Sequence, residues 1–146
     1  MAIIKNTGGE GLKNLREHIG KLAQGRVLVG VPRSSNGARG NAYIAMIHEF
    51  GLGHNPERSF LRSTVFEQAD KYAKIIAETI PQAVKGGMSE RDAYARLGTI
   101  AVNDVKMKIG SGPFAPLSQV TIDRKKSSKP LIDTGMLRQS INYEIR

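Results

Sequence analysis

Residues 130–141 read PLIDTGMLRQSI, and this segment joins a turn, the start of a short helix and a closing strand. Side-chain oxygens of Asp133 or Thr134 can accept hydrogen bonds from free first-turn N–H groups near Gly135. Leu137 and Ile141 lie four residues apart, the spacing that brings two side chains to one side of a helix. The segment pairs no nucleophile with a base and gathers no metal ligands, so its pattern is typical of assembly rather than of catalysis.

Two long helices are predicted before this segment. In the first, Thr64 and Glu67 have capping-box spacing, and Pro81 is expected to end or kink the helix because proline has no N–H to donate. The second is expected to begin at Ser89 and to stop near Gly110. Each carries apolar residues at spacings of three and four: Phe66, Ala69, Ala73, Ile76 and Ile80 in the first, and Ala93, Leu97, Ile100, Ala101 and Val105 in the second.

Shorter patterns complete the expected secondary structure. Leucine and isoleucine spacing predicts an amphipathic helix over residues 10–23, and Asn41 is expected to cap a helix that runs to Phe50. Alternating apolar residues predict strands over residues 26–31 and 141–146. The first of these strands is apolar on both faces, so we expect it to be covered on both.

These elements predict an α+β fold in a single domain over residues 1–146, with a small, mainly antiparallel sheet packed against two long helices. The chain is long enough for one core of moderate size. Three polar or glycine-rich segments are predicted to be flexible: an N-terminal arm over residues 1–9, a loop over residues 33–40, and a long basic loop over residues 111–129.

The chain has 22 Lys and Arg against 13 Asp and Glu, a formal net charge of +9. This balance favours polyanionic partners such as DNA, although charges that only face water would give the same count. There is no cysteine, which excludes a disulfide framework and thiolate zinc sites. The N-terminus lacks the pattern of a signal peptide, and no apolar run approaches the roughly 20 residues of a membrane span, so no membrane partner is expected.

His48, Glu49 and His54 invite comparison with a metallopeptidase. A zinc-binding helix needs two histidines at i and i+4, whereas these two are six residues apart with glycines between them. We therefore expect Glu49 to pair with a nearby base such as Arg58, and we expect neither catalysis nor a cofactor or metal.

Three blocks between about Ile44 and Ile141 occur in the order IHEFG…NPERSFLR, FAPLSQVTIDRKK and PLIDTGMLRQSI. Together they resemble the tail-completion, or head–tail joining, proteins of tailed bacteriophages. The segment after Asn55 matches a recurrent Pro-x-Arg-x-Phe-Leu motif of that family. It has Ser59 where the family often has proline, and this departure leaves the turn less rigid.

The resemblance implies a structural virion protein at the junction of head and tail, assembled in the host cytoplasm. It would form a homo-oligomeric ring, most plausibly sixfold, that joins the capsid connector to the tail and lets DNA pass. Its partners would be further copies of itself, the head connector or adaptor, and tail terminator or tube proteins. A small basic protein that binds nucleic acid without sequence preference remains the alternative.

Candidate contact residues follow from the motif and from the charge. Arginine makes bidentate contacts and is enriched in interfaces, although for the apolar pair Phe60 and Leu61 we favour a role as a core plug with solvated flanks. No aromatic residues alternate with the basic run near residue 125, so sequence-specific recognition of nucleic acid is not expected. The predicted subunit or partner interface is Arg58, Phe60, Arg62 and Arg138, and the predicted DNA-facing or partner-facing residues are Arg33, Arg39, Arg124, Lys125, Lys126 and Lys129.

Overall fold

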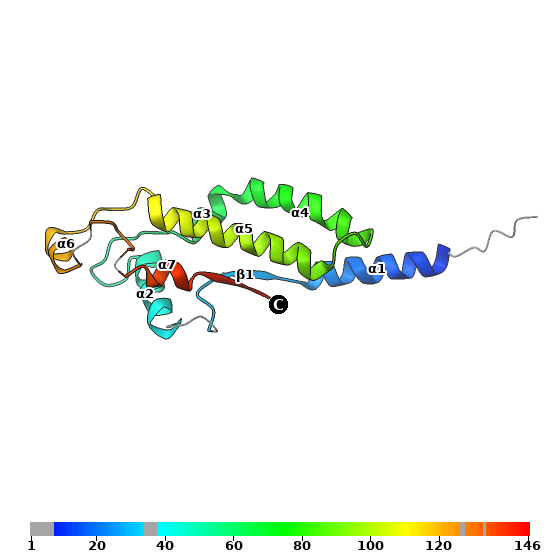
Figure 1. The fold of residues 1–146 in the computed structure, drawn as a ribbon, viewed down its shortest axis with the longest axis horizontal. Helices are drawn as coiled ribbons and strands as arrows, with labels where there is room; N and C mark the ends of the chain where they lie inside the picture. The colour runs from blue at the N-terminus through cyan, green and yellow to red at the C-terminus, as the bar shows by residue number, and fades with distance from the viewer. Residues whose placement is uncertain (1–7, 34–37, 126–127, 133) are drawn as a thin grey trace, which may run out of the picture.

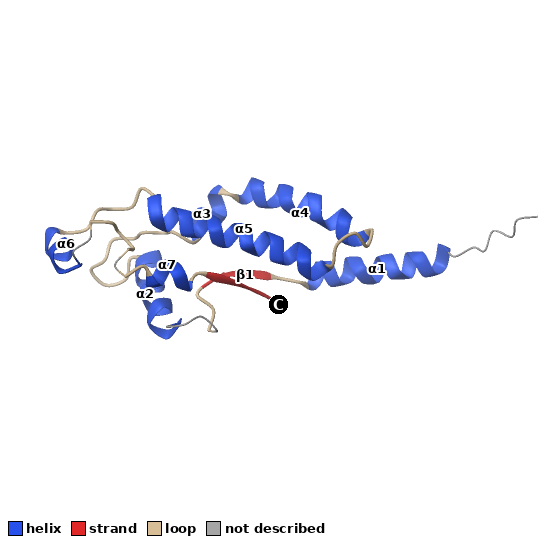
Figure 2. Cartoon of the chain, viewed as in Figure 1, coloured by secondary structure: helices blue, strands red, loops and turns tan. Residues whose placement is uncertain are grey.

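The computed structural model describes residues 8–33, 38–125, 128–132 and 134–146, and the chain has the predicted α+β fold (Figure 2). Helices dominate, and the two described strands are short. In chain order the elements are α1 (Gly8–Gln24), β1 (Val27–Gly30), α2 (Ala38–Phe50), α3 (Arg62–Glu67), α4 (Ala69–Val84), α5 (Glu90–Ser111), α6 (Gln119–Lys125), α7 (Met136–Ser140) and β2 (Asn142–Ile145).

The longest helix, α5, lies in the middle of the molecule (Figure 1). Strands β1 and β2 pair antiparallel, with Val27 opposite Ile145 and Val29 opposite Tyr143, and both strands pack against α5. Helix α4 packs on α5 from the side away from the sheet. Helix α5 therefore contacts the sheet directly, and α4 packs on α5.

The outer face of this two-stranded sheet is open. Val29 packs against the core, whereas Leu28, which points the other way, is 43% exposed. The expectation that the first strand would be covered on both faces is wrong. Apolar residues on both faces of a strand are buried on both sides only where a second layer packs on the sheet. Within the described part of the chain, no element packs on this outer face.

The core forms where the C-terminal segment meets α5. Leu137 is 6% exposed and Ile141 is 1% exposed, so the predicted burial of this pair is confirmed. Gly135 has a φ of 77°, the left-handed conformation expected of a glycine before the short helix. The buried core residues are Phe60, Val102, Val105, Ile109, Leu131, Leu137 and Ile141.

Helix α5 begins as predicted. The Ser89 hydroxyl accepts a hydrogen bond from the backbone N–H of Asp92 at 3.0 Å, as an N-cap should. The other predicted cap is wrong: Thr64 lies within α3, and its hydroxyl donates to the Phe60 carbonyl at 2.6 Å. The expected single helix is interrupted at Gln68, where α3 ends and α4 follows.

Helix α4 continues through Pro81 to Val84 and stops before Gly86, which has a left-handed φ of 77°. Its buried face is also different from the predicted one. Ile75 and Thr79 are 9% and 3% exposed, whereas Ile76 and Ile80, which belong to the predicted apolar repeat, are 40% and 38% exposed. Both rows of side chains have helical spacing, and the spacing alone does not tell which row meets α5.

The predicted flexible segments contain more structure than expected. Helix α1 begins at Gly8, while residues 1–7 of the predicted arm lie outside the described ranges. Helix α2 begins at Ala38, so Asn41 is an interior helical residue, 6% exposed, rather than a cap. In the 111–129 segment, which was predicted to be a flexible loop, Phe114 packs against the core.

Contact between α5 and the sheet depends on Gly98, which is buried in the middle of the helix. A Cβ atom at this position would lie 2.5 Å from the ring carbons of Tyr143 on β2. Carbon atoms do not approach so closely, so a side chain here would push the strand away from α5. The absent side chain therefore allows the ring to lie directly against the helix backbone.

We predict that Gly98→Ala lowers the free energy of unfolding by about 1–3 kcal/mol through overpacking. The matched control is Gly110→Ala in the same helix, where a Cβ atom has no neighbour within 4 Å. That change should be neutral or stabilising by up to about 1 kcal/mol, because alanine favours the helix. Denaturant unfolding of both variants tests the contact, and equal effects would contradict it.

Candidate functional site

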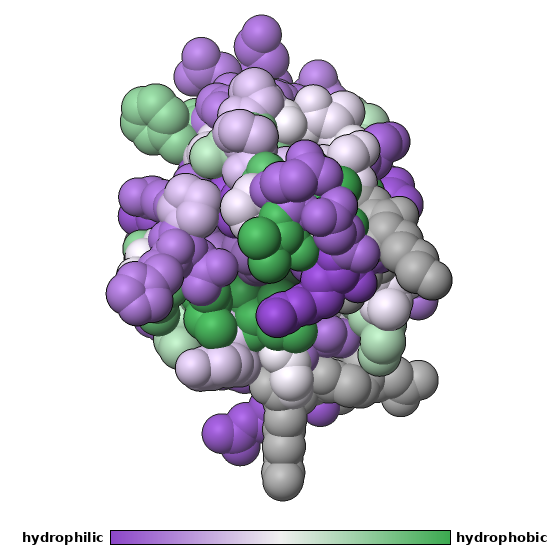
Figure 3. Space-filling view, turned by 90° about the vertical axis from the view of Figure 1, so that its left-hand side faces the viewer, coloured by the Kyte–Doolittle hydropathy of each residue, from purple (hydrophilic) through white to green (hydrophobic). Residues whose placement is uncertain are grey.

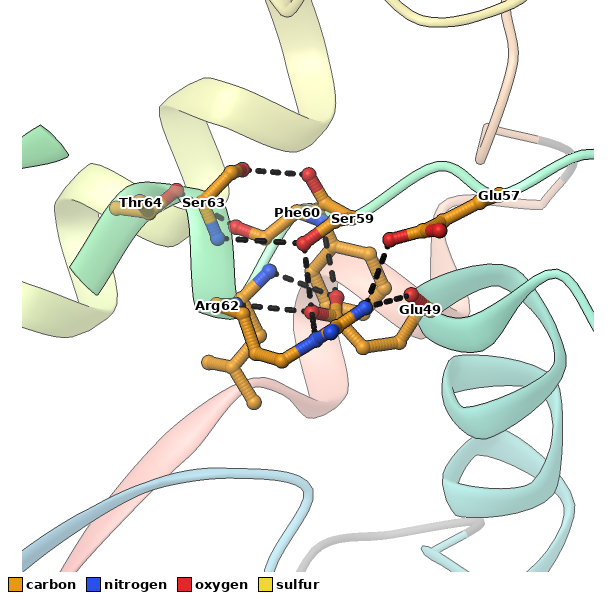
Figure 4. Close-up of polar contacts among 8 residues, drawn as sticks. Glu49, Glu57, Ser59, Phe60, Arg62, Ser63 and Thr64 are labelled. Atoms are coloured by element: carbon orange, nitrogen blue, oxygen red, sulfur yellow. Dashed lines mark hydrogen bonds and ion pairs between the residues drawn. The ribbon is translucent and has the colours of Figure 1, made fainter. Parts of the chain in front are cut away.

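A buried carboxylate connects the end of α2 to the start of α3 (Figure 4). Glu49 is 4% exposed, and its Oε2 accepts hydrogen bonds from the backbone N–H groups of Phe60 and Leu61, both at 2.9 Å. Its Oε1 accepts from the N–H of Arg62, also at 2.9 Å. A single side chain thus satisfies three donors at the beginning of a helix, where intrahelical acceptors are missing.

Side chains of the following segment complete this arrangement. The Ser59 hydroxyl donates to Glu49 Oε1 at 2.8 Å, and Arg62 Nε donates to the same oxygen at 3.0 Å. Arg62 Nη2 also reaches the Glu49 carbonyl and the Glu57 carboxylate, both at 2.8 Å, and its guanidinium lies 4.5 Å from the centroid of the Phe50 ring. The predicted partner of Glu49, Arg58, is therefore wrong: the partner is Arg62.

The electrostatics of Glu49 favour its ionised form. Burial acts to raise its pKa, but hydrogen bonds from Leu61, Arg62, Ser59 and Phe60 outweigh burial and leave the pKa below its ordinary value of 4.5. A carboxyl with a depressed pKa stabilises the fold fully above its unfolded pKa. That stabilisation is lost as the pH falls below about 4.5 through the folded value.

Arg58 has an internal role. It is 4% exposed, and its Nε and Nη2 donate to the carbonyls of Ala115 and Pro116 at 2.8 and 3.0 Å. Its own backbone N–H donates to the His48 carbonyl at 2.7 Å. Arg58 therefore ties the segment before α6 to the end of α2.

The four predicted interface residues divide into two pairs. Arg58 and Phe60 are buried at 4% and 1% exposure, so their predicted contact with a partner is corrected to an internal role. Arg62 keeps 53% of its side chain exposed, and Arg138 is exposed while its Nε donates to the Lys106 carbonyl at 3.0 Å. Only the second pair is accessible to a partner, and its interface role stays a prediction.

The predicted basic surface is described in part. Arg33, Arg124 and Lys129 are exposed, while Lys125 is half-buried at the end of α6. Arg39 belongs to α2, but its side chain is among the parts that the structure does not describe, and Lys126 lies outside the described ranges.

A hollow of about 320 Å³ lies between α2, the end of α6 and α7. Figure 3 views the molecule from the end at which these helices lie, where apolar residues gather near the centre and hydrophilic residues surround them. This hollow was not predicted from the sequence, although Asn41, Ile44 and His48 share one helical face. Its lining consists of Asn41, Ile44, His48, Lys125, Leu131, Thr134, Gly135, Met136 and Leu137.

His48 is the most perturbed titratable group in this hollow. Burial, together with the positive charges of Arg58 and Lys125, lowers its pKa from 6.5 to about 4. Within the described residues, its Nδ1 atom is buried without a hydrogen-bond partner. Among the residues that the structure describes, no three His, Asp or Glu side chains are grouped so as to hold a metal ion.

Comparison of the chain with protein families, with curated proteins and with solved structures found no match. Within the described ranges, no helix is long and apolar enough to cross a membrane.

We predict that Glu49→Gln lowers the free energy of unfolding by about 1–3 kcal/mol, because an amide cannot accept hydrogen bonds at both terminal atoms and leaves buried donors unpaired. The control is Glu57→Gln, which removes the exposed partner of Arg62 and should change stability by less than about 1 kcal/mol. Thermal unfolding at pH 7 compares the two variants. Equal losses would show that the buried hydrogen bonds of Glu49 contribute no more to stability than an exposed ion pair.

We also predict that stability falls as the pH is lowered from 6.5 towards 4. In that range an unfolded His48 takes up a proton that the folded protein does not, and the stability therefore rises with pH. In His48→Leu this part of the pH dependence should disappear. The same replacement at exposed His54 is the control and should keep the wild-type dependence. Unfolding midpoints at pH 7, 6, 5 and 4.5 measure the effect, and identical slopes in all three proteins would refute it.

Proposed function

We propose that this chain is a structural virion protein at the head–tail junction of a tailed bacteriophage. In this role it forms a homo-oligomeric ring, sixfold to match a tail tube, that joins the capsid connector to the tail and leaves a passage for DNA. The proposal rests on the resemblance of three sequence blocks, taken together with the way in which those blocks meet in the fold.

The observation that carries the proposal is this meeting of the three blocks. Arg58 of the first block donates to Ala115 and Pro116 of the second at 2.8 and 3.0 Å. Phe60 of the first block belongs to the same buried cluster as Leu137 of the third. Motifs that are far apart in the chain thus depend on one another, which supports interpreting them as one structural unit rather than as three unrelated matches.

The accessible groups at this end suit recognition of a partner. Arg62 is held by Glu49 and Glu57 while half of its side chain remains exposed. A guanidinium that is already oriented loses little freedom when it binds a carboxylate on a neighbour. The mechanism we propose is therefore binding by a rigid end, with the net positive charge available to acidic neighbours or to passing DNA.

The test is a variant that leaves the buried contacts of Glu49, Arg58 and Phe60 intact. Arg138→Glu removes an exposed cation and one hydrogen bond to the Lys106 carbonyl, so the subunit should still fold. In the phage that encodes the chain, we expect this variant to yield at least about tenfold fewer joined head–tail particles, as counted by electron microscopy. The control is Arg96→Glu, a charge reversal at an exposed residue of α5, and it should assemble normally.

Separate free heads and free tails should accumulate when the chain is absent. Normal particles in its absence would refute the proposal. Tight binding of the isolated chain to free duplex DNA, with a steep dependence on salt, would instead favour the alternative of a nucleic-acid-binding protein.

A further inference from the structure

Strand β2 is an edge strand whose outer side is unpaired in the described part of the chain. The sheet consists of β1 and β2 alone, and β2 ends at the mark C in Figure 1. An unpaired edge presents a row of backbone N–H and C=O groups, and an extended segment of another protein can add to it as a further strand. The outer edge of β2 is therefore a candidate docking surface.

The register identifies which backbone groups face outwards. Arg26 and Arg146 exchange two backbone hydrogen bonds, at 2.6 and 2.9 Å, and such pairs alternate with non-hydrogen-bonded pairs along an antiparallel ladder. The N–H and C=O of Ile145, one residue earlier, thus point away from β1, and among the described residues no backbone group pairs with them. Tyr143 presents its C=O in the same way, while its N–H donates to Asn142 Oδ1 at 2.9 Å.

A hollow of about 600 Å³ lies beside this edge. Residues 142–146 line one side of it, and Arg91 and Ala95 of α5 line the other. The four residues of β2 extend over about 13 Å, which gives room for a segment of about four extended residues. We call this hollow the β2 groove.

The charges at the β2 groove favour an acidic segment. Arg91 is exposed and, within the described residues, makes no salt bridge, whereas Glu144 is already paired with Arg146 at 2.8 Å. A guanidinium without an acidic partner can bind a carboxylate through two hydrogen bonds. The net charge of +9 attracts an acidic segment and repels a second copy of this chain.

We propose that the β2 groove binds an extended acidic segment of a partner protein, which adds to β2 as an antiparallel strand. The inference goes beyond the proposed function, because head–tail joining requires neither this surface nor this chemistry of partner. The backbone groups of Ile145 and Tyr143 supply the hydrogen bonds, and Arg91 supplies the preference for an acid.

The geometry also fixes the order of residues in the bound segment. Residues directly opposite one another in an antiparallel pair have side chains on the same face, so those opposite Ile145 and Tyr143 point towards α5. The Tyr143 ring lies against Gly98, and β2 runs from there towards the start of α5, where Arg91 lies (Figure 1). An acidic residue therefore fits opposite Ile145, and an apolar residue fits opposite Tyr143. The residue between them is opposite Glu144 and should not be acidic, because like charges at that spacing repel.

The probe for this inference is the pentapeptide amide Thr-Glu-Thr-Val-Thr with a fluorescent label at its N-terminus. Fluorescence anisotropy measures its binding to the isolated chain. N-methylation of the glutamate and the valine removes the two N–H groups that face β2, and we expect binding to weaken at least about tenfold. N-methylation of the central threonine, whose N–H faces away from β2, is the control and should leave binding unchanged. Equal affinities of the two methylated peptides, or no binding of the probe, would overturn the inference.

A charge exchange tests the role of Arg91. Arg91→Glu should weaken binding of the probe at least about tenfold and should strengthen binding of the same peptide with lysine in place of glutamate. Arg96→Glu is the matched control, because it makes the same change at an exposed residue of α5 that does not line the groove. If the two variants weaken binding equally, the probe responds only to the net charge of the protein, and the inference is wrong.

Amide hydrogen exchange locates the bound strand independently. A saturating concentration of the probe should slow exchange of the Ile145 N–H at least about tenfold, because this donor gains a partner. The Glu144 N–H, which already faces β1, is the internal control and should change much less. Slowing of neither amide would contradict the added strand. The particle assay of Arg138→Glu concerns a residue outside the groove, so head–tail joining and this inference can fail separately.

Discussion

The tertiary structure at the α2 end of the molecule depends on the hydrogen bonds that Glu49 accepts. Gly51 makes this arrangement accessible, because its φ of 63° reverses the chain directly after α2 and the nearby backbone of Glu57 leaves no room for a side chain. The reversal brings residues 59–62 back to the carboxylate, which accepts hydrogen bonds from the Ser59 hydroxyl and from the backbone N–H groups of residues 60–62. Phe60 is consequently directed into the core, where it meets α5 and the C-terminal segment.

A second internal arginine contact extends this order to the segment before α6. Arg58 is buried, yet within the described structure its guanidinium bonds to two carbonyls rather than to an acid. A cation that lacks a carboxylate partner in the interior is costly unless its donors are satisfied. The backbone carbonyls of Ala115 and Pro116 accept these hydrogen bonds. The segment before α6, which was predicted to be a flexible loop, is therefore held by the motif that precedes α3.

Local patterns predicted the Ser89 cap and the C-terminal apolar pair correctly but not the caps expected at Thr64 and Asn41, and features that depend on tertiary partners were not predicted. Ser89 caps α5 through its own neighbours, and Leu137 with Ile141 form a pair within one short stretch, so both could be predicted. The burial of Ile75 in place of Ile76 depends on where α5 lies, and the pairing of Glu49 with Arg62 depends on the turn at Gly51. Neither partner is visible in residue spacing.

The pairing of β1 with β2 has a consequence for how the chain folds. Gly30 is opposite Asn142, so the sheet joins segments from near the two ends of the described chain. Contacts between such distant segments close a large loop before they gain stability, which makes folding slow. During synthesis, the edge of β1 and the apolar face of α5 stay uncovered until the segment after residue 130 has been made. Nascent chains therefore pass through a period in which they are prone to aggregate, and chaperones that shield apolar surface should raise the yield of folded subunits.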